Sequence, residues 1–119
     1  MKVFISGGSG FVGTRLSSNF LAQGHDVIGV GGSKKNKTLN HKNYTYVSAD
    51  TTKAGKWQNY LKNADAVINL AGQTIFHYWT KQYKKKIYDS RILTTRNIVS
   101  ALPKDHPILF LSASAIGIY

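Results

Sequence analysis

The residues best suited to do chemistry are three glycines spaced three apart, Gly7, Gly10 and Gly13, in the segment GGSGFVG of residues 7–13. An apolar, strand-like segment, Met1 to Ser6, precedes them, and a helix-like segment follows. In this context Gly7 supplies a turn with positive φ, Gly10 lets the backbone approach a pyrophosphate, and Gly13 lets the helix pack tightly on the strand. The N–H groups at the start of that helix then point at the phosphates. The spacing predicts a nucleotide-phosphate site, and the alternative is an ordinary tight turn.

The position of the acidic residues bears on which nucleotide is bound. In NAD sites of this kind an acid about 20 positions beyond the glycines hydrogen-bonds the ribose hydroxyls. Here Asp26 precedes the second predicted strand and Asp50 follows the third, so neither stands at that place. Ser33 and Lys34, followed by Lys35, stand there instead, and they can hold a ribose 2′-phosphate by charge-assisted hydrogen bonds. The missing acid favours NADP over NAD; the alternative is that these lysines are merely exposed loop residues.

Two other polar residues accompany predicted strands. Asp50 stands at the end of the third strand, where it could accept a hydrogen bond from an adenine amino group, cap the helix that follows, or do both. Asn69 lies inside an apolar strand. Because buried amides are hydrogen-bonded, we expect Asn69 to bridge neighbouring strands rather than to catalyse.

Composition bears on other classes of site. The four histidines are scattered with no pair at metal-ligand spacing, and there is no cysteine, so we expect neither a metal nor a disulfide. Sixteen Lys and Arg against five Asp give a net charge of +11, which attracts polyanions. The lysine clusters at 34–37 and 84–86 lack an aromatic-basic recognition motif. They indicate solvated faces, and nucleic-acid binding is the weakest alternative.

Length and hydropathy indicate a single domain. The 119 residues open without a signal peptide, and no apolar run reaches the about 18 residues of a membrane span. We therefore expect a soluble cytoplasmic protein that does not bind membranes.

The elements that must position these residues follow from hydrophobic periodicity. Phe11, Val12, Leu16, Phe20 and Leu21 lie on the apolar face of a helix over 10–23, and Thr94, Ile98 and Ala101 lie on one side of a later one. Continuous apolar runs are typical of parallel strands buried on both faces. Beyond residue 23 we predict strands at 27–30, 44–48, 66–71 and 107–112, a short helix at 53–63, and a long helix from a Thr80 cap to 102, ended by Pro103.

This order predicts an α/β fold, a three-layer Rossmann-like parallel sheet of order 3-2-1-4-5 with helices on both faces. Ligands of such sheets bind outside the carboxyl ends of the strands. The polar or glycine-bearing segments at 6–7, 31–33, 50–51, 71–73 and 112–114 would gather at that edge. Residues 108–111 would then form an apolar edge strand, where we expect self-association as a homo-oligomer, or poor solubility.

Four segments, at 6–13, 69–72, 79–97 and 112–119, resemble the extended short-chain dehydrogenase/reductase superfamily. Within it they resemble the epimerase-like group labelled nucleoside-diphosphate-sugar epimerase-like or cell-division-inhibitor-like. The resemblance covers nearly the whole chain. It implies an NAD(P)-binding Rossmann fold with the glycine loop, including Phe11 and Val12, on the pyrophosphate, Asp50 near adenine, and Ala71 and Gly72 along the cofactor.

The catalytic residues of that superfamily are matched only in part. Ser114 corresponds best to the serine that orients the substrate, with Ser112 as the alternative. The Tyr-x-x-x-Lys element lies downstream of Tyr119 in the family, and Arg91 stands where many relatives have an asparagine that assists proton relay.

We therefore expect residues 1–119 to be an incomplete NAD(P)-binding domain, truncated after the fifth strand and without its substrate-binding part. It would be the NADP-binding amino-terminal portion of an epimerase- or reductase-like protein with an unidentified small-molecule substrate, a nucleotide sugar being one candidate, and with little turnover of its own. The alternative is a non-catalytic dinucleotide-sensing or protein-interaction module.

Overall fold

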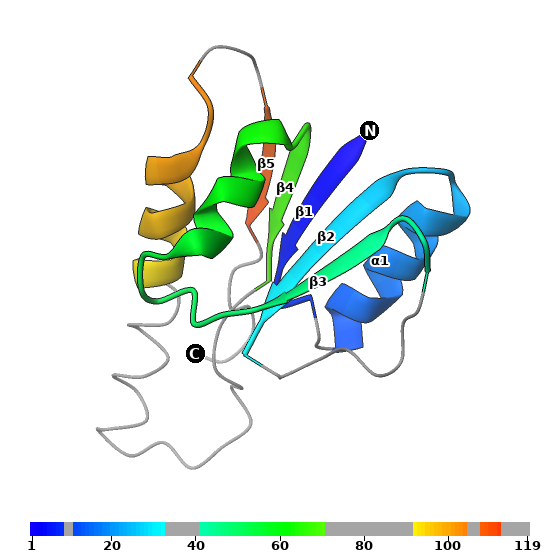
Figure 1. Cartoon of the computed structure of the whole chain (residues 1–119), viewed down its shortest axis with the longest axis horizontal. Coiled ribbons are helices and arrows are strands. Elements are labelled where there is room, and N and C mark those ends of the chain that lie inside the picture. Colours follow the sequence, from blue (N-terminus) through cyan, green and yellow to red (C-terminus); the bar gives the residue numbers. More distant parts are fainter. Residues whose placement is uncertain (9–10, 33–40, 71–91, 105–107, 113–119) are drawn as a thin grey trace, which may run out of the picture.

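The computed structural model describes residues 1–8, 11–32, 41–70, 92–104 and 108–112, which form a sheet between layers of helix (Figure 1). The elements, in chain order, are β1 (Lys2–Ser6), α1 (Phe11–Ala22), β2 (Asp26–Gly31), β3 (Tyr44–Ser48), the 3₁₀ helix η1 (Lys56–Asn63), β4 (Ala66–Asn69) and β5 (Leu109–Ser112), with a further helix over residues 92–101 before β5.

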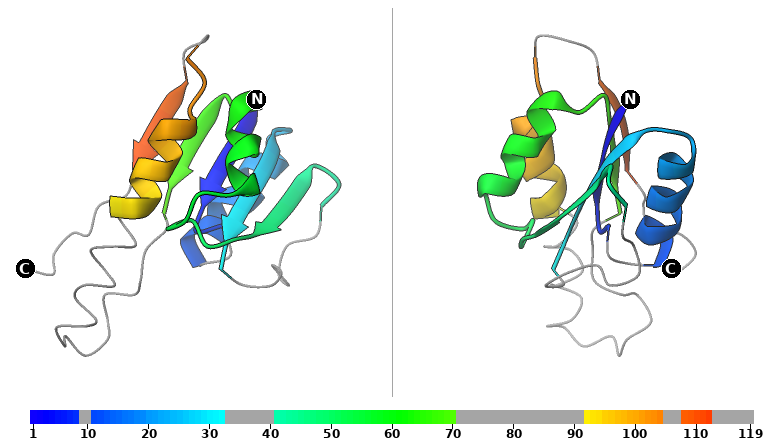
Figure 2. Two further views of the ribbon diagram at one scale, coloured as in Figure 1. Left: turned by 60° about the vertical axis from the view of Figure 1, so that its left-hand side comes forward. Right: turned by 45° about the vertical axis from the view of Figure 1, so that its right-hand side comes forward.

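The strand order is β3-β2-β1-β4-β5, and every neighbouring pair is parallel, which confirms the predicted Rossmann-like topology. β3 has the predicted bounds, and the other strands begin and end within two residues of theirs. Helix α1 covers one face of the sheet, whereas η1 and the helix over 92–101 cover the other (Figure 2). Because all strands point the same way, their carboxyl ends lie along one edge, at the bottom of Figure 1.

The core consists of two clusters because β1 is buried on both faces. Val3 and Ile5 belong to the cluster under α1, which includes Leu21 and Ile68. The alternate residue Phe4 belongs to the cluster under η1 and the 92–101 helix, which includes Trp57, Leu61, Val67 and Ile98. The rings of Phe4 and Trp57 lie 6.2 Å apart. Burial on both faces explains why β1 and β4 are continuously apolar.

The predicted apolar face of α1 is wrong at one position. Val12 is 54% exposed, although its spacing suggested that it faces the sheet. The buried positions are Gly13, Ser17 and Leu21, four residues apart, and Val12 lies about 100° around the helix from Gly13. The side chain of Val12 therefore contributes nothing to the core.

The short helix also differs from its prediction. It begins at Lys56 rather than at residue 53, as a 3₁₀ helix after the extended Gly55. Trp57, Tyr60 and Leu61 recur at the spacing of one helix face, but only Trp57 and Leu61 are buried; Tyr60 is 39% exposed and borders a hollow beside β2 and β3.

The helix over 92–101 agrees with its prediction where the structure describes it. Thr94 and Ile98 are buried, Ala101 packs against the second cluster, and the helix ends before Pro103. The proposed Thr80 cap lies outside the described residues. Within the part of the chain that the structure describes, no helix is long and apolar enough to cross a membrane.

Candidate functional site

The glycine loop follows β1 and returns to the end of β2. Gly7 has a φ of 75°, the left-handed conformation predicted for it, and glycine adopts this without a steric penalty. The N–H groups of Gly7 and Gly8 both donate to the carbonyl oxygen of Val30, over 2.7 and 3.0 Å. The loop is thereby held against the carboxyl end of β2, where the chain turns out of the sheet.

Gly13 brings the start of α1 against this loop. A Cβ built on Gly13 would overlap the carbonyl oxygen of Gly7 and lie 2.9 Å from the Cα of Gly8. Only glycine therefore permits this approach, as predicted, although the contact is with the loop rather than with the strand itself. The first turn of α1 contains no acidic residue, so no carboxylate of that turn competes for its N–H groups. Gly10 lies outside the described residues.

A second close approach, which the sequence did not predict, lies between the glycine loop and the middle of β2. A Cβ on Gly8 would lie 2.8 Å from the Cα of Gly29 in β2. On the same face, a Cβ on Gly29 would overlap the hydroxyl oxygen of Tyr44, the first residue of β3. A glycine in the middle of an apolar strand is the signal that points to such a contact.

Buried polar side chains join the ends of β1 and β4. The Ser6 hydroxyl donates to Asn69 Oδ1 over 2.5 Å, and Asn69 Nδ2 donates to the Thr95 hydroxyl over 3.0 Å. Ser6 and Asn69 are both buried. The prediction that Asn69 bridges neighbouring strands is confirmed, and the bridge continues into the helix over 92–101.

A second set of polar contacts joins the segment after β3 to the same helix. The hydroxyls of Thr51 and Thr94 lie 2.9 Å apart and are buried. Asn97 Nδ2 donates to the carbonyl oxygen of Thr51 over 3.0 Å, and Gln58 Nε2 donates to the carbonyl oxygen of Asn97 over 2.8 Å. This helix thus holds Thr51 through both its side chain and its backbone.

Asp50 is exposed and closes a local turn. Its Oδ1 accepts hydrogen bonds from the Thr52 hydroxyl over 2.6 Å and from the Thr52 N–H over 3.0 Å. The hydrogen bond from the Thr52 hydroxyl is the main cause that lowers the pKa of Asp50. Partial burial opposes it, and the Thr52 N–H and the Lys53 charge lower the pKa further. The alternative that Asp50 caps the following helix is wrong. η1 begins at Lys56, and the residue that caps it is Gly55, whose N–H donates to Gln58 Oε1.

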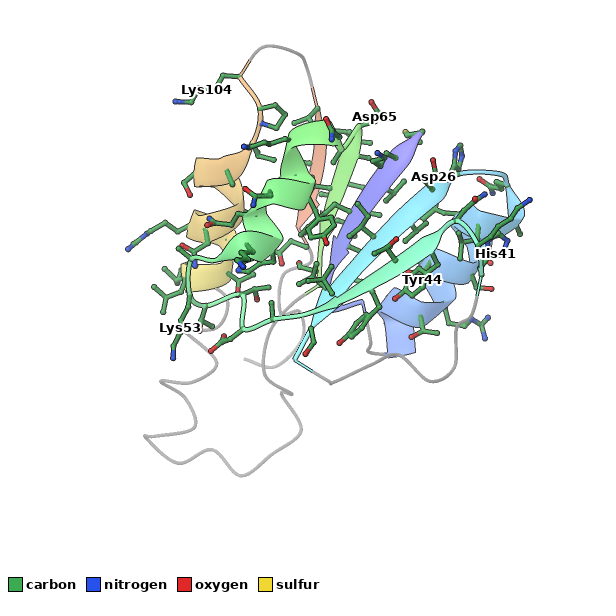
Figure 3. All side chains as sticks on the ribbon, viewed as in Figure 1. Asp26, His41, Tyr44, Lys53, Asp65 and Lys104 are labelled. Carbon is green, nitrogen blue, oxygen red and sulfur yellow. The ribbon has the colours of Figure 1, made fainter. Side chains whose placement is uncertain are left out.

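Several predicted site residues lie outside the part of the chain that the structure describes: Gly10, Ser33, Lys34, Ala71, Gly72 and Ser114. Phe11 and Val12 open α1 beside the loop. Asp26 is the first residue of β2, at the amino ends of the strands, and Figure 3 shows it on the side of Asp65, away from Lys53. Its place confirms that it cannot act at the end of β2. Among the described residues, no three histidines or carboxylates are grouped as metal ligands would be.

A polar hollow of about 520 Å³ lies at the amino ends of the strands, opposite the glycine loop. Lys2, Asp26, Lys42, Asn59 and Asn63 are among its lining residues. Most of these side chains are exposed. Because it lies at the amino ends of the strands, the hollow is distinct from the carboxyl edge, where the glycines and the buried polar side chains lie.

Comparisons with known proteins agree with this geometry. The model of the NAD dependent epimerase/dehydratase family matches residues 3–119. The epimerase family protein YfhF of Bacillus subtilis is 37% identical over 121 residues, covering 100% of this chain and 39% of that protein. The chain thus spans less than half the length of this relative.

Two solved structures share the fold. The human epimerase family protein SDR39U1, solved with NADPH, is 26% identical with a TM-score of 0.69, and the match covers 100% of this chain and 38% of that one. A short-chain dehydrogenase/reductase superfamily protein from Agrobacterium tumefaciens, solved with bound NAD, is 17% identical with a TM-score of 0.77, and the match covers 97% and 33% of the two chains. The latter likeness concerns the fold alone.

Proposed function

Since the chain belongs to the NAD dependent epimerase/dehydratase family, we propose that it binds NADP at the carboxyl edge of its sheet, as part of an epimerase- or reductase-like protein. The observation that carries this proposal is the contact of Gly13 with Gly7 and Gly8, which sets the start of α1 against the loop after β1. Such a helix start favours a pyrophosphate through its N–H groups and its dipole. When bound, the nicotinamide supplies the hydride donor or acceptor of a redox step.

The described residues fit such a ligand. Gly7 takes a left-handed turn, Gly8 and Gly13 allow close backbone contacts that a Cβ would block, and the first turn of α1 carries no acid that would repel phosphate. The adenosine half then lies toward β2 and β3, where Asp50 is proposed to face the adenine, and the nicotinamide half lies toward β4, where Ala71 and Gly72 follow the strand.

The preference for NADP rests on the residues that follow β2. No acid stands there to bind the ribose hydroxyls of NAD, whereas Ser33 and Lys34 offer a hydroxyl and a positive charge to a 2′-phosphate. The NADPH in the structure of the human relative supports this preference.

The test is a comparison of NADPH and NADH dissociation constants for the wild type, Lys34→Glu and Lys42→Glu. Lys42 lines the hollow at the opposite edge, so its substitution makes the same change in charge away from the proposed site. We expect the wild type and Lys42→Glu to prefer NADPH, and Lys34→Glu to lose that preference. Equal affinities for both nucleotides in all three proteins would contradict the NADP assignment and leave the dinucleotide site intact.

Substrate chemistry is proposed to need residues beyond these 119. The chain contains no Tyr-x-x-x-Lys element, and the relatives that it matches are longer. Ser114 is proposed to orient a small substrate, for which a nucleotide sugar is one candidate. We expect this chain to bind NADPH but to oxidise it negligibly with any added nucleotide sugar, because a proton donor of tuned pKa is not supplied.

A second candidate function is a dinucleotide-sensing or interaction module, favoured by the edge strand β5. Leu109 and Leu111 are 58% and 52% exposed, and the outer side of β5 carries no neighbouring strand among the described residues. An apolar strand with an open edge pairs readily with another strand. The proposed partner is a second copy of this chain.

A further inference from the structure

We infer that Thr94 and Thr95 are positioning residues that hold the two halves of the dinucleotide site at a fixed separation. They are consecutive residues of the helix over 92–101, yet their hydroxyls contact segments from different strands. Thr94 contacts Thr51, which follows β3, and Thr95 accepts a hydrogen bond from Asn69, the last residue of β4. This inference rests on the proposed function, because it assigns roles toward the proposed cofactor.

The strand order shows that these two contacts reach segments that leave widely separated strands. β2 and β1 stand between β3 and β4, so β3 and β4 are three strand spacings apart, about 14 Å. The chain leaves β3 and crosses back toward η1, which brings Thr51 to the helix, as the green trace in Figure 1 shows. One turn of the helix over 92–101 therefore contacts segments that leave strands on either side of β1.

Each contact leads to a different half of the proposed site. Thr51 directly follows Asp50, which is proposed to face the adenine, and Thr51 is held at its hydroxyl by Thr94 and at its carbonyl by Asn97. On the other side, Thr95 holds Asn69, and Asn69 accepts a hydrogen bond from Ser6, the residue before the glycine loop. Thr94 thus acts on the adenosine half, and Thr95 acts on the pyrophosphate and nicotinamide half.

Apolar packing alone does not require these hydroxyls. Ile98, one turn along the same helix, is fully buried in the core and already anchors the helix to the sheet. Valine would fill nearly the same volume as threonine at position 94. A buried hydrogen bond adds direction, so it fixes the position of its partner in a way that packing does not. The two hydroxyls are therefore suited to set geometry rather than to supply burial.

The test uses two probes, 2′-AMP for the adenosine half and NADPH for the whole site, with dissociation constants measured by calorimetry. Thr94→Val is expected to weaken both probes by about tenfold, because both need the adenosine half. Thr95→Val is expected to weaken NADPH by about tenfold and to leave 2′-AMP within a factor of about two. Thr45→Val, an exposed threonine at the amino end of β3, is the control and should change neither.

A merely structural role would not produce this split, since a loss of folded protein lowers the binding of both probes alike. If both valine variants weaken both probes equally, or weaken neither, the inference is overturned while the proposed function stands. If the wild type binds neither NADPH nor NADH, the proposed function fails and the inference with it. If Thr94→Val does not fold, Thr51→Val removes the same hydrogen bond from its other side and must weaken the binding of both probes. Thr95→Ser keeps the hydroxyl and must bind both probes as the wild type does.

Discussion

The carboxyl and amino edges of the sheet are both polar, but they are built differently. At the carboxyl edge, Ser6, Asn69, Thr51 and Thr94 are buried and bond to one another or to the neighbouring helix, and glycines let backbone segments touch. At the amino edge, side chains such as Lys42, Asn59 and Asn63 line a hollow of about 520 Å³ and are exposed (Figure 3 shows Asp26 and Asp65 on this side).

This difference indicates where a ligand finds a preorganised surface. Buried polar groups that hydrogen-bond to each other fix the backbone around them, so little conformational entropy is lost when a ligand binds there. Exposed side chains around an open hollow keep their rotamer freedom and must lose it on binding. The presence of a hollow is therefore a weaker guide to function here than the buried polar contacts and close glycine contacts of the described residues at the opposite edge.

The largest expected effect comes from a substitution that breaks the carboxyl edge. In Gly13→Val the new side chain must push the start of α1 away from Gly7 and Gly8, so NADPH affinity should fall by more than about a hundredfold. Gly24→Asn is the control: Gly24 has a φ of 87° with open space around it, at the other end of α1, and asparagine tolerates that conformation. NADPH fluorescence titration measures both. Unchanged binding by Gly13→Val would mean that the loop is an ordinary turn.

A second substitution tests the close packing of Gly29 in β2 against the Tyr44 ring, next to the glycine loop. Gly29→Ala should lower the free energy of unfolding by about 1–3 kcal/mol, because the added methyl group overlaps the Tyr44 hydroxyl. In a Tyr44→Phe background the same substitution should cost less, since the nearest remaining ring atom lies 3.1 Å from the added Cβ. A double-mutant cycle by urea unfolding measures this coupling. Equal costs in the two backgrounds would show that Tyr44 does not limit the space at Gly29.

These two predictions mark what the sequence reveals and what it does not. Gly7, Gly13, the apolar strands and the strand order were predictable because turns, burial on both faces and crossover handedness are local or topological properties. The contact of Gly29 with Tyr44 and the bond between Thr51 and Thr94 join residues far apart in sequence, and no periodicity encodes them. Val12 and Asp50 were misplaced for a related reason: the exact rotation of α1 and the start of η1 depend on packing that the sequence leaves open.

A smaller effect concerns the pH dependence of the turn at Asp50. Because hydrogen bonds from Thr52 lower the folded-state pKa of Asp50 below 3.8, they stabilise the fold above that pH, and this contribution is lost as the pH falls through the lowered pKa. Thr52→Val should therefore be less stable than the wild type near pH 7, and the difference should shrink at acidic pH. Urea unfolding across this range measures it, with Thr45→Val, on the exposed part of β3, as the control. A difference that is the same at about pH 3 and about pH 7 would show that the Asp50 carboxylate is not the partner that matters.

The smallest expected effect concerns the open side of the outermost strand β5, which belongs to neither the carboxyl nor the amino edge of the sheet. We expect weak self-association through β5 that strengthens with added salt, because the net charge of +11 opposes it at low ionic strength. Leu109→Lys should abolish it, whereas Val99→Lys, an equally exposed apolar position on the helix over 92–101, should not. Light scattering at high protein concentration measures the association. A wild type that stays monomeric at high salt would remove this proposal.

The most direct measurement of the central claim is an amide NMR titration with NADPH that follows both edges at once. We predict the largest shift changes at Gly7, Gly8 and the first turn of α1, with little change at Lys42, Asn59 and Asn63. Shift changes that concentrate at the amino-edge hollow, or no change at the glycine loop under saturating NADPH, would contradict the assignment of the dinucleotide site to the carboxyl edge.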